Sequence, residues 1–363
     1  MPSISEVFRI LLMISCCVCI LFTGGCGESE DNDPDEMLTI MEDPIHSYAS
    51  YPIGVAIDSP HMLDDDIYYR SLATHHHNSA TPGNDMKMDA LHPDENSYSW
   101  DNAEEILDFC NQHEMRVHGH VLVWHQQVPS WMEEYEGTPE EWEAILKDHI
   151  QTIITHFAGS VDSWDVVNEA FEENGQLRHT IWRDNIGDDY IAKCFQWARE
   201  AGPSIKLFYN DFSLSYNAQK MQAVLEMIDD FRSRDPEIPI DGIGFQMHIS
   251  DDQPLNEYIQ AAVDSVKSRD LLIHFSELDV SLNKFGLYSE LTEEMKIRQK
   301  ERYSDIVQIY NTIPRDQQFG ITIWGISDAD SWIRYCFNRL DWPLLFDEEF
   351  EPKPAFWGFV TSL

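Results

Sequence analysis

The chain has 363 residues, 43% of them hydrophobic, and its 65 Asp and Glu residues against 24 Lys and Arg give a formal net charge of -41. Such a charge repels nucleic acids and anionic membrane surfaces over the distances that salt does not screen, which argues against nucleic-acid partners and polyanionic ligands. The length would allow two average domains, but barrels of β/α units routinely fold about 250 or more residues as one domain.

The N-terminal region has the features of an export signal. Residues 10–22 form an apolar run shorter than the roughly 20 residues of a membrane-spanning helix, and this run predicts the core of a signal peptide over residues 1–25. Residues 23–26 resemble a bacterial lipoprotein cleavage site, although Thr23 stands where such sites usually have leucine. We therefore expect an exported protein that is lipid-anchored to the bacterial cell envelope through Cys26, or is otherwise secreted.

An acidic segment follows the predicted signal peptide. Between residues 27 and 47 there are eight acidic residues and no Lys or Arg, a composition that cannot bury a core. We predict a disordered tether over residues 26–47 and a folded domain over residues 48–363. No Gly/Ser-rich or Pro-rich linker interrupts residues 50–363, so we expect one domain without an appended binding module.

From residue 53 onward, short apolar runs rich in β-branched residues alternate with longer amphipathic stretches. This alternation is typical of repeated βα units around a parallel sheet, and eight such units predict an α/β protein with a (β/α)8 TIM barrel. The predicted strands cover residues 53–57, 74–81, 116–123, 161–167, 206–210, 240–247, 272–278 and 319–324. The predicted helices include residues 102–113, 140–156, 188–201, 218–232, 255–268 and 293–309.

Polar and aromatic side chains follow nearly every predicted strand, where a barrel of this type builds its active site. In chain order they are Asn84, Lys87, His120, Trp124, His125, Gln127, Asn168, Glu169, Gln246, His248, Glu277, Asp279 and Trp324. Hydrolysis of a glycoside needs one carboxylic acid to protonate the leaving oxygen and one carboxylate at the anomeric carbon. Glu169 on the fourth strand and Glu277 on the seventh can supply them across the barrel mouth.

Six fragments carry a family resemblance. They are TPGNDMK (81–87), GHVLVWH (119–125), WDVVNE (164–169), DGIGFQMH (241–248), SELD (276–279) and TIWGISD (322–328). In this order they resemble glycoside hydrolase family 10, the xylanase family with catalytic glutamates on strands four and seven. The resemblance runs from about residue 53 to residue 356 and implies endo-acting hydrolysis of β-1,4-xylosidic linkages in xylan with retention of configuration.

The resemblance also implies roles for individual residues. Glu169 would be the general acid and base, and Glu277 the nucleophile. His248 would be the partner of the nucleophile, with Asp279 orienting its imidazole, and Asn168 would bind the sugar 2-hydroxyl with help from Gln246. No cofactor and no metal is implied. The expected partners are xylan and xylo-oligosaccharides, with no protein partner and a monomeric chain.

Subsites are implied in the same way. The sugar just upstream of the cut would be bound by Lys87, His120, Trp124, Trp324 and Trp332, and the next sugar by Asn84 and Gln127. At Gly83 the family usually has a glutamate that binds this second sugar. Loss of such a charge-assisted hydrogen bond, worth roughly 1.5 to 3 kcal/mol, should weaken the subsite. Two smaller departures, Met88 and His118, are expected to concern packing beneath the site.

Other interpretations stay open. The triplet at residues 75–77, or His118 with His120, could be metal ligands of a barrel metallohydrolase, but the triplet starts the predicted second strand and alternates between its faces. A catalytically silent surface protein that only binds polysaccharide is also possible, because fold does not fix function. Cleavage of mixed-linkage glucan is a further possibility, since a pocket discriminates weakly against one hydroxymethyl group. Cys110, Cys194 and Cys336 are predicted to be buried thiols.

Overall fold

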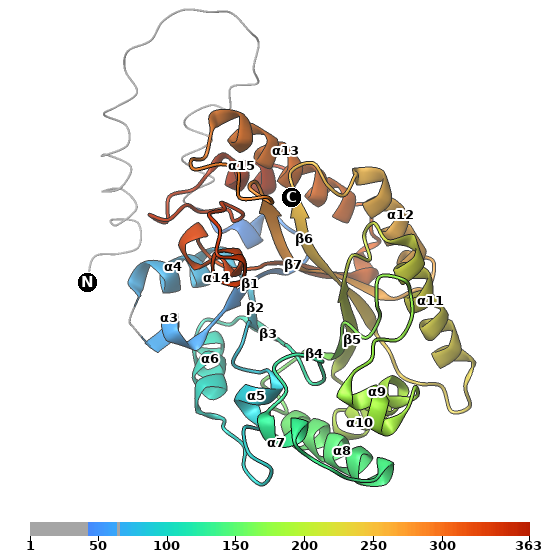
Figure 1. Ribbon diagram of the computed structural model, residues 1–363. Coiled ribbons are helices and arrows are strands. Elements are labelled where there is room, and N and C mark those ends of the chain that lie inside the picture. The colour runs from blue at the N-terminus through green and yellow to red at the C-terminus, as the bar shows by residue number, and fades with distance from the viewer. Residues whose placement is uncertain (1–42, 64–65) are drawn as a thin grey trace, which may run out of the picture.

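A computed structural model of the protein describes residues 43–63 and 66–363 (Figure 1). Eight parallel strands form a barrel in chain order, closed by pairing of the last strand with the first, which confirms the predicted (β/α)8 TIM barrel. The strands are β1 (Ile53–Ile57), β2 (Ser79–Pro82), β3 (Arg116–Gly119), β4 (Ser163–Asn168), β5 (Lys206–Phe212), β6 (Gly242–Ser250), β7 (Leu272–Ser281) and β8 (Gln318–Ile323). The predicted signal peptide, Cys26 and residues 27–42 of the predicted tether lie outside the described residues.

Helices surround the barrel and fill its connections (Figure 1). They are α3 (Ser59–Leu63), α4 (Ile67–His76), α5 (Met88–Leu91), α6 (Asp101–Gln112), α7 (Ser130–Glu133), α8 (Pro139–His156), α9 (Ile181–Ile186), α10 (Tyr190–Ala201), α11 (Ala218–Ser233), α12 (Asn256–Lys267), α13 (Glu293–Tyr310), α14 (Trp332–Phe337) and α15 (Pro354–Val360), with 3-10 turns η1 (Ile45–Ser47), η2 (Arg315–Gln317) and η3 (Asp328–Asp330). The six predicted helices agree with α6, α8 and α10 to α13 within two residues at each end. In the described part of the chain, no helix combines the length and apolar character needed to cross a membrane.

Local sequence explains where the longer helices begin and which face they bury. Thr138 caps α8, because its hydroxyl accepts from the Glu141 N–H at 3.3 Å and the Glu141 carboxylate accepts from the Thr138 N–H at 2.8 Å. Pro139 occupies the first turn, where its missing N–H costs nothing. The buried positions of α8 recur at helical spacing, so one stripe packs on the barrel; they are Trp142, Leu146, His149, Ile150, Ile153 and Ile154.

The second predicted strand is wrong at its start. Residues 74–76 end helix α4 rather than beginning β2, and the helix starts at a cap in which Asp66 accepts from the Tyr69 N–H at 3.1 Å. The predicted strand 74–81 contains three consecutive histidines between Thr74 and Thr81, and these residues show no helical pattern of apolar side chains. The predicted third strand is also too long, because after Gly119 the chain leaves the regular ladder and only Val123 forms a bridge, to Val167 on β4.

The folded barrel begins earlier than residue 48. Ile45 in η1 is fully buried and belongs to the main core, and η1 contacts α4. The acidic composition of residues 27–47 concealed this one apolar anchor. The boundary between the predicted tether and the domain therefore lies at or before residue 45.

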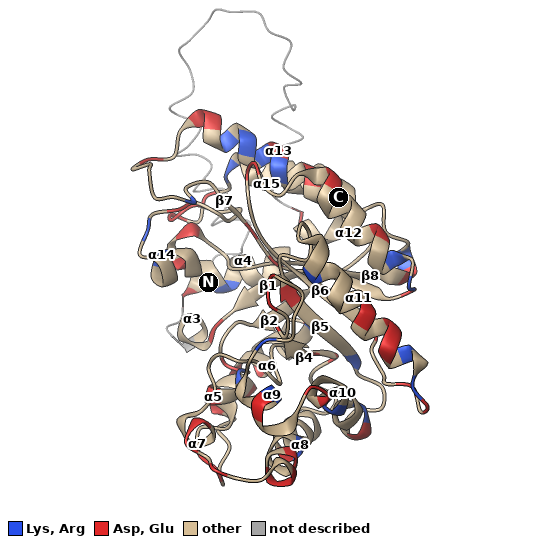
Figure 2. Cartoon of the chain, turned by 45° about the vertical axis from the view of Figure 1, so that its right-hand side comes forward, with Lys and Arg blue, Asp and Glu red and all other residues tan. Residues whose placement is uncertain are grey.

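Charge is distributed over the outside of the barrel. Figure 2 shows acidic residues on many outer helices and loops, with a group of basic residues on α13. Two basic side chains of α13 pair with neighbouring acids: Lys296 with Glu293 at 2.8 Å, and Arg298 with Asp251 at 2.7 Å and with Glu294 at 3.0 Å. These exposed pairs are each worth little, so the stability of the fold comes from the packed core.

Candidate active site

A cleft of about 1060 Å³ lies at the carboxyl ends of the strands. Twelve of the thirteen residues predicted for catalysis, catalytic support and substrate binding line it: Asn84, Lys87, His120, Trp124, Gln127, Asn168, Glu169, Gln246, His248, Glu277, Trp324 and Trp332. The thirteenth, Asp279, lies behind the imidazole of His248 and contacts it directly. Residues from seven separate segments of the chain therefore meet in one cleft, as the strand-end pattern predicts.

Two glutamates face this cleft from strained backbone positions. Glu169 directly follows β4, and Glu277 lies within β7 where its pairing with β8 shifts register between Phe275 and Leu278. Both glutamates have φ of 56°, a left-handed value that residues other than glycine rarely adopt. Strain of this kind persists where the surrounding structure over-determines it, and it turns both carboxyl groups into the mouth of the barrel.

A chain of charged hydrogen bonds holds Glu277. His248 Nε2 donates to Glu277 Oε2 at 3.0 Å, and His248 Nδ1 donates to Asp279 Oδ2 at 2.7 Å. Burial by itself would lower the pKa of His248, but Asp279 and Glu277 outweigh it and raise the pKa to about 10. Burial would likewise raise the pKa of Glu277, yet the hydrogen bond from His248 and the charges of His120 and His248 lower it. Glu277 is therefore held as a carboxylate beside an imidazolium.

Glu169 has the opposite electrostatic environment. Its side chain is buried, which raises its pKa, and the negative charge of Glu277 raises it further. The indole N–H of Trp124 and the amide of Gln246 act in the other direction but do not cancel these effects. The two carboxyl groups of the cleft thus differ in ionisation, with Glu169 the one that keeps a proton to higher pH.

Amide side chains connect the two glutamates. Gln246 Nε2 donates to Glu169 Oε1 at 3.1 Å and to Asn168 Oδ1 at 2.9 Å. Asn210 Nδ2 donates to the same Asn168 oxygen at 3.0 Å and to Glu277 Oε1 at 2.7 Å. Asn210 was missed by the sequence reasoning, although it stands at the end of the predicted fifth strand. A Cβ on Gly244 would lie 2.2 Å from Asn210 Oδ1, so a glycine is required there to admit this side chain.

Contacts among the other predicted subsite residues fix their positions in the cleft. Lys87 Nζ donates to Asn84 Oδ1 at 3.0 Å and lies 5.1 Å from the centre of the Trp124 ring. His120 stands edge-on to Trp324 at 5.6 Å. Trp332 Nε1 donates to Asp279 Oδ2 at 2.8 Å, so the same carboxylate orients both this indole and His248. Aromatic faces and fixed polar groups of this kind suit a sugar ring.

Asp165 is a further residue that the strand-end pattern did not single out. It is buried within β4, its Oδ2 accepts from His120 Nδ1 at 2.9 Å, and its Oδ1 lies 3.1 Å from His118 Nε2 as an ion pair. Burial would raise the pKa of Asp165, but the two imidazoles lower it far below its usual range. His118 therefore packs beneath the cleft as expected, and Met88 is buried in the core.

The histidine triplet lies in the helix layer. His76 is buried against the rings of Phe346 and Phe356, and His77 Nδ1 bonds to the Ala73 carbonyl at 3.2 Å. Within residues 43–63 and 66–363, no group of three or more His, Cys, Asp or Glu side chains is arranged to hold a metal ion. The prediction of buried thiols is confirmed for Cys110 and Cys194 but wrong for Cys336, which is exposed on α14 at the rim of the cleft.

A buried ion pair supports the loop that carries Glu169. Lys220 Nζ lies 2.7 Å from Asp211 Oδ1, and neither side chain is exposed. Asp211 Oδ2 accepts from the Tyr209 hydroxyl at 2.5 Å, and that hydroxyl accepts from the Ala170 N–H at 3.0 Å. Burial raises the pKa of Asp211 to about 7 even though Lys220 lowers it. Burial of this ion pair costs desolvation free energy, and removal of one partner would leave the other charge buried without compensation.

We expect Lys220→Met to lower the free energy of unfolding by about 3 to 5 kcal/mol, because it leaves the Asp211 charge buried without a partner. The double variant Lys220→Met, Asp211→Asn removes both charges and should lose clearly less stability than the single variant. Urea denaturation of both variants measures the difference. Equal losses would show that packing, and not the uncompensated charge, dominates at this position.

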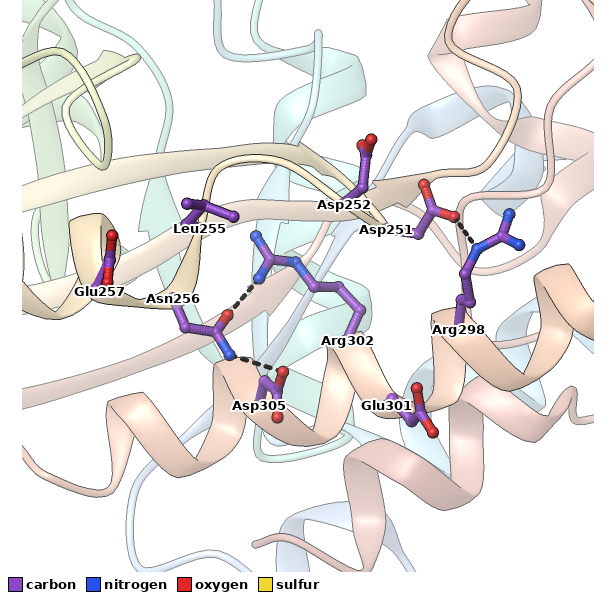
Figure 3. A pocket seen from close by; sticks show the side chains of 9 residues that line it. All are labelled: Asp251, Asp252, Leu255, Asn256, Glu257, Arg298, Glu301, Arg302 and Asp305. Atoms are coloured by element: carbon purple, nitrogen blue, oxygen red, sulfur yellow. Dashed lines mark hydrogen bonds and ion pairs between the residues drawn. The ribbon is translucent and has the colours of Figure 1, made fainter.

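A second hollow, lined by residues of the loop after β6 and of α12 and α13, shares no lining residue with the cleft (Figure 3). The Arg302 guanidinium donates to Asn256 and to the carbonyl oxygens of Ser250 and Pro254, and Arg298 pairs with Asp251. Both guanidinium groups of this hollow are therefore already hydrogen-bonded within the protein. The two-carboxylate cleft remains the better candidate for an active site.

Comparisons with known proteins all indicate the same family. Residues 41–362 match the model of glycosyl hydrolase family 10. Endo-beta-1,4-xylanase Xyn10C of Cellvibrio japonicus is 36% identical over 343 residues, covering 87% of this chain and 56% of the relative, so the chain spans about half the length of that protein. Endo-1,4-beta-xylanase B of Thermotoga neapolitana is 36% identical over 340 residues, covering 93% of this chain and 94% of the relative.

Solved structures agree with this result. A mutant of xylanase 10C from Cellvibrio japonicus in complex with xylopentaose superposes with a TM-score of 0.84 at 36% identity, covering 88% of this chain and 69% of the other. Native xylanase 10B from Thermotoga maritima superposes with a TM-score of 0.82 at 35% identity, covering 88% and 96%. With the barrel, the paired strand-end glutamates and these matches together, the chain belongs to glycosyl hydrolase family 10.

Proposed function

We propose that this chain is a retaining endo-1,4-β-xylanase, with Glu277 as nucleophile and Glu169 as general acid and base. One observation carries the proposal: two buried carboxyl groups share a cleft, and their surroundings lower the pKa of Glu277 while raising that of Glu169. This division suits one group to attack and the other to donate a proton. The names of relatives from Cellvibrio japonicus and Thermotoga neapolitana, both endo-xylanases, support xylan as the substrate.

The geometry supports a double displacement. A Glu277 oxygen attacks the anomeric carbon while Glu169 gives its proton to the glycosidic oxygen, so the glycosidic bond breaks and a glycosyl ester forms. Glu169, now ionised, then takes a proton from water, whose oxygen attacks the same carbon and frees Glu277. Two inversions at one carbon give net retention. His248 and Asn210, which hold separate oxygens of Glu277, position the nucleophile for both steps.

The proposal predicts a bell-shaped dependence of kcat/KM on pH. Activity should fall at low pH as Glu277 becomes protonated, below the ordinary range of a glutamate because its pKa is lowered. Activity should fall at high pH as Glu169 loses its proton, above that range because its pKa is raised. His248, with its pKa raised to about 10, stays protonated through both limbs. Persistence of the basic limb in Glu169→Ala on an activated aryl xylobioside would contradict the assignment.

The substrate class is tested by incubating residues 43–363 with glucuronoxylan, mixed-linkage β-glucan and carboxymethylcellulose, and by sizing the products. We expect short xylo-oligosaccharides from the first polymer and less cleavage of the others. The glucans belong in the comparison because one relative, of Acetivibrio thermocellus, is named an exoglucanase. If all three polymers keep their full length and the protein binds xylan, the result would favour a polysaccharide-binding protein without catalytic activity.

Export of the chain is also a proposal. The apolar run at residues 10–22 and the lipoprotein-like residues 23–26 support a signal peptide and a lipid on Cys26, followed by an acidic tether and a monomeric enzyme at the cell envelope. Fractionation of bacterial cells that produce the full chain tests this. The native chain should sediment with membranes and the Cys26→Ser variant should not. Recovery of both in the cytosol would contradict export.

A further inference from the structure

Asp58 is a further acidic residue of the cleft. It directly follows β1, and Gly83 directly follows β2; the two strands pair in parallel, with Ile57 opposite Pro82 and the Gly83 N–H bonded to the Ile57 oxygen at 2.9 Å. Asp58 and Gly83 therefore leave neighbouring strands at the same height of the barrel mouth. Both line the cleft with Asn84 and Lys87.

The Asp58 carboxylate stands against the space beside Gly83. A Cβ added to Gly83 would lie 3.0 Å from Asp58 Oδ1 and 3.3 Å from Oδ2. The absence of a side chain at position 83 is thus matched by a carboxylate that reaches the same place from the adjacent strand. The three heavy atoms nearest to that added atom all belong to the Asp58 carboxyl group.

Hydrogen bonds connect Asp58 to Asn84 and, through it, to Lys87. Asn84 Nδ2 donates to Asp58 Oδ1 at 3.2 Å, and Asn84 Oδ1 accepts from Lys87 Nζ at 3.0 Å. Burial and the nearby Asp85 raise the pKa of Asp58, while Asn84 and Lys87 lower it. A carboxylate offers about four acceptor positions, so the bond from Asn84 leaves capacity for a hydroxyl donor from a ligand.

We propose that Asp58 is a specificity-determining residue that binds a hydroxyl of the sugar two places upstream of the cut, from the space that Gly83 leaves open. This inference rests on the proposed function, because it assigns a subsite of the same cleft. It changes the expectation drawn from sequence, in which Gly83 left this subsite without a carboxylate. The carboxylate is present but comes from β1 instead of β2.

The inference reverses the expected sign of one substitution. On sequence grounds alone, Gly83→Glu should improve binding. In the structure, the new side chain would start 3.0 Å from the Asp58 carboxylate and bring a second negative charge beside it. Gly83→Glu should therefore raise KM in the native background and lower it in the Asp58→Ala background, a coupling that a double-mutant cycle measures.

Two aryl substrates isolate the subsite. A 4-nitrophenyl β-xylobioside fills both upstream subsites, whereas a 4-nitrophenyl β-xyloside fills only the first. In Asp58→Ala, the ratio of kcat/KM for the xylobioside over the xyloside should fall roughly 10- to 100-fold, the effect of losing one charge-assisted hydrogen bond. Asp58→Asn, which keeps the shape and an acceptor but not the charge, should give a smaller fall. Asp94→Ala, which removes an exposed carboxylate outside the cleft, should leave the ratio at the native value.

The outcomes separate the inference from the function on which it depends. If the native enzyme cleaves xylan and both aryl substrates while Asp58→Ala keeps the native ratio, Asp58 does not bind the second sugar and the inference fails alone. If Gly83→Glu lowers KM with Asp58 in place, it also fails. If the native enzyme cleaves none of these substrates, the proposed function and the inference fall together. A reduced ratio that Gly83→Glu restores in the Asp58→Ala background supports the inference against a merely structural role.

Discussion

Glu277→Ala should lower kcat on xylan by several orders of magnitude, which is the largest effect expected for any single substitution in this chain. Removal of the carboxylate abolishes the covalent step, and Asp279, the carboxylate on the other side of the imidazole, is held by His248 and Trp332 and cannot replace it. Initial rates of reducing-sugar release measure the effect. Glu290→Ala, which removes an exposed glutamate from the loop after the same strand, is the matched control and should keep native activity.

A small anion provides the second part of this test. In Glu277→Ala, azide can occupy the space of the missing carboxylate and attack an activated aryl β-xylobioside from that side, giving a glycosyl azide of inverted, α configuration. Formation of this azide would show that the nucleophile attacks the anomeric carbon from the side on which residue 277 lies. Substantial hydrolysis of xylan by Glu277→Ala without any added anion would refute the role of Glu277.

Glu169→Ala should show the second largest effect, and the loss should depend on the leaving group. On xylan the leaving sugar needs a proton, so kcat should again fall by several orders of magnitude. A 4-nitrophenolate leaves without a proton, so formation of the glycosyl ester on the aryl xylobioside should be much less affected, and the ester should accumulate because its hydrolysis has lost the base. A burst of nitrophenolate followed by a slow steady rate is the expected trace.

The comparison between substrates is what identifies the acid. Equal losses on xylan and on the aryl xylobioside would mean that Glu169 acts on binding or on folding and not on the leaving group. Glu172→Ala, which removes a half-exposed glutamate from the same loop, is the matched control for structural damage and should retain the native ratio between the two substrates.

Much of this architecture could be predicted from sequence because the local patterns are strong. The amphipathic helices α6, α10 and α12 carry clear periodicity and agree with prediction within two residues. The second strand was less predictable because β2 has four residues, too few for a period, and the preceding helix ends in two of three consecutive histidines, His75 and His76. Ile45 was hidden for a similar reason, as one apolar residue at the end of an acidic segment.

The site was predictable where a strand end coincides with a family motif, and not where the contact is tertiary. Glu169, Glu277 and His248 belong to the fragments that carry the resemblance, and all three line the cleft. Asn210 and Asp58 stand at strand ends too, but what makes them important is a partner on another strand: Glu277 for the first and Gly83 for the second. Sequence spacing contains no information about such contacts between side chains of different strands.

The anomeric proton of the product reports directly on a retaining double displacement between Glu169 and Glu277. Proton NMR during the first minutes of hydrolysis of xylohexaose by residues 43–363 distinguishes the two anomers before they interconvert. We expect the β-anomer of the new reducing end to appear first and the α-anomer only later, by mutarotation. Initial appearance of the α-anomer would contradict the covalent role of Glu277 and would require water to attack the sugar directly.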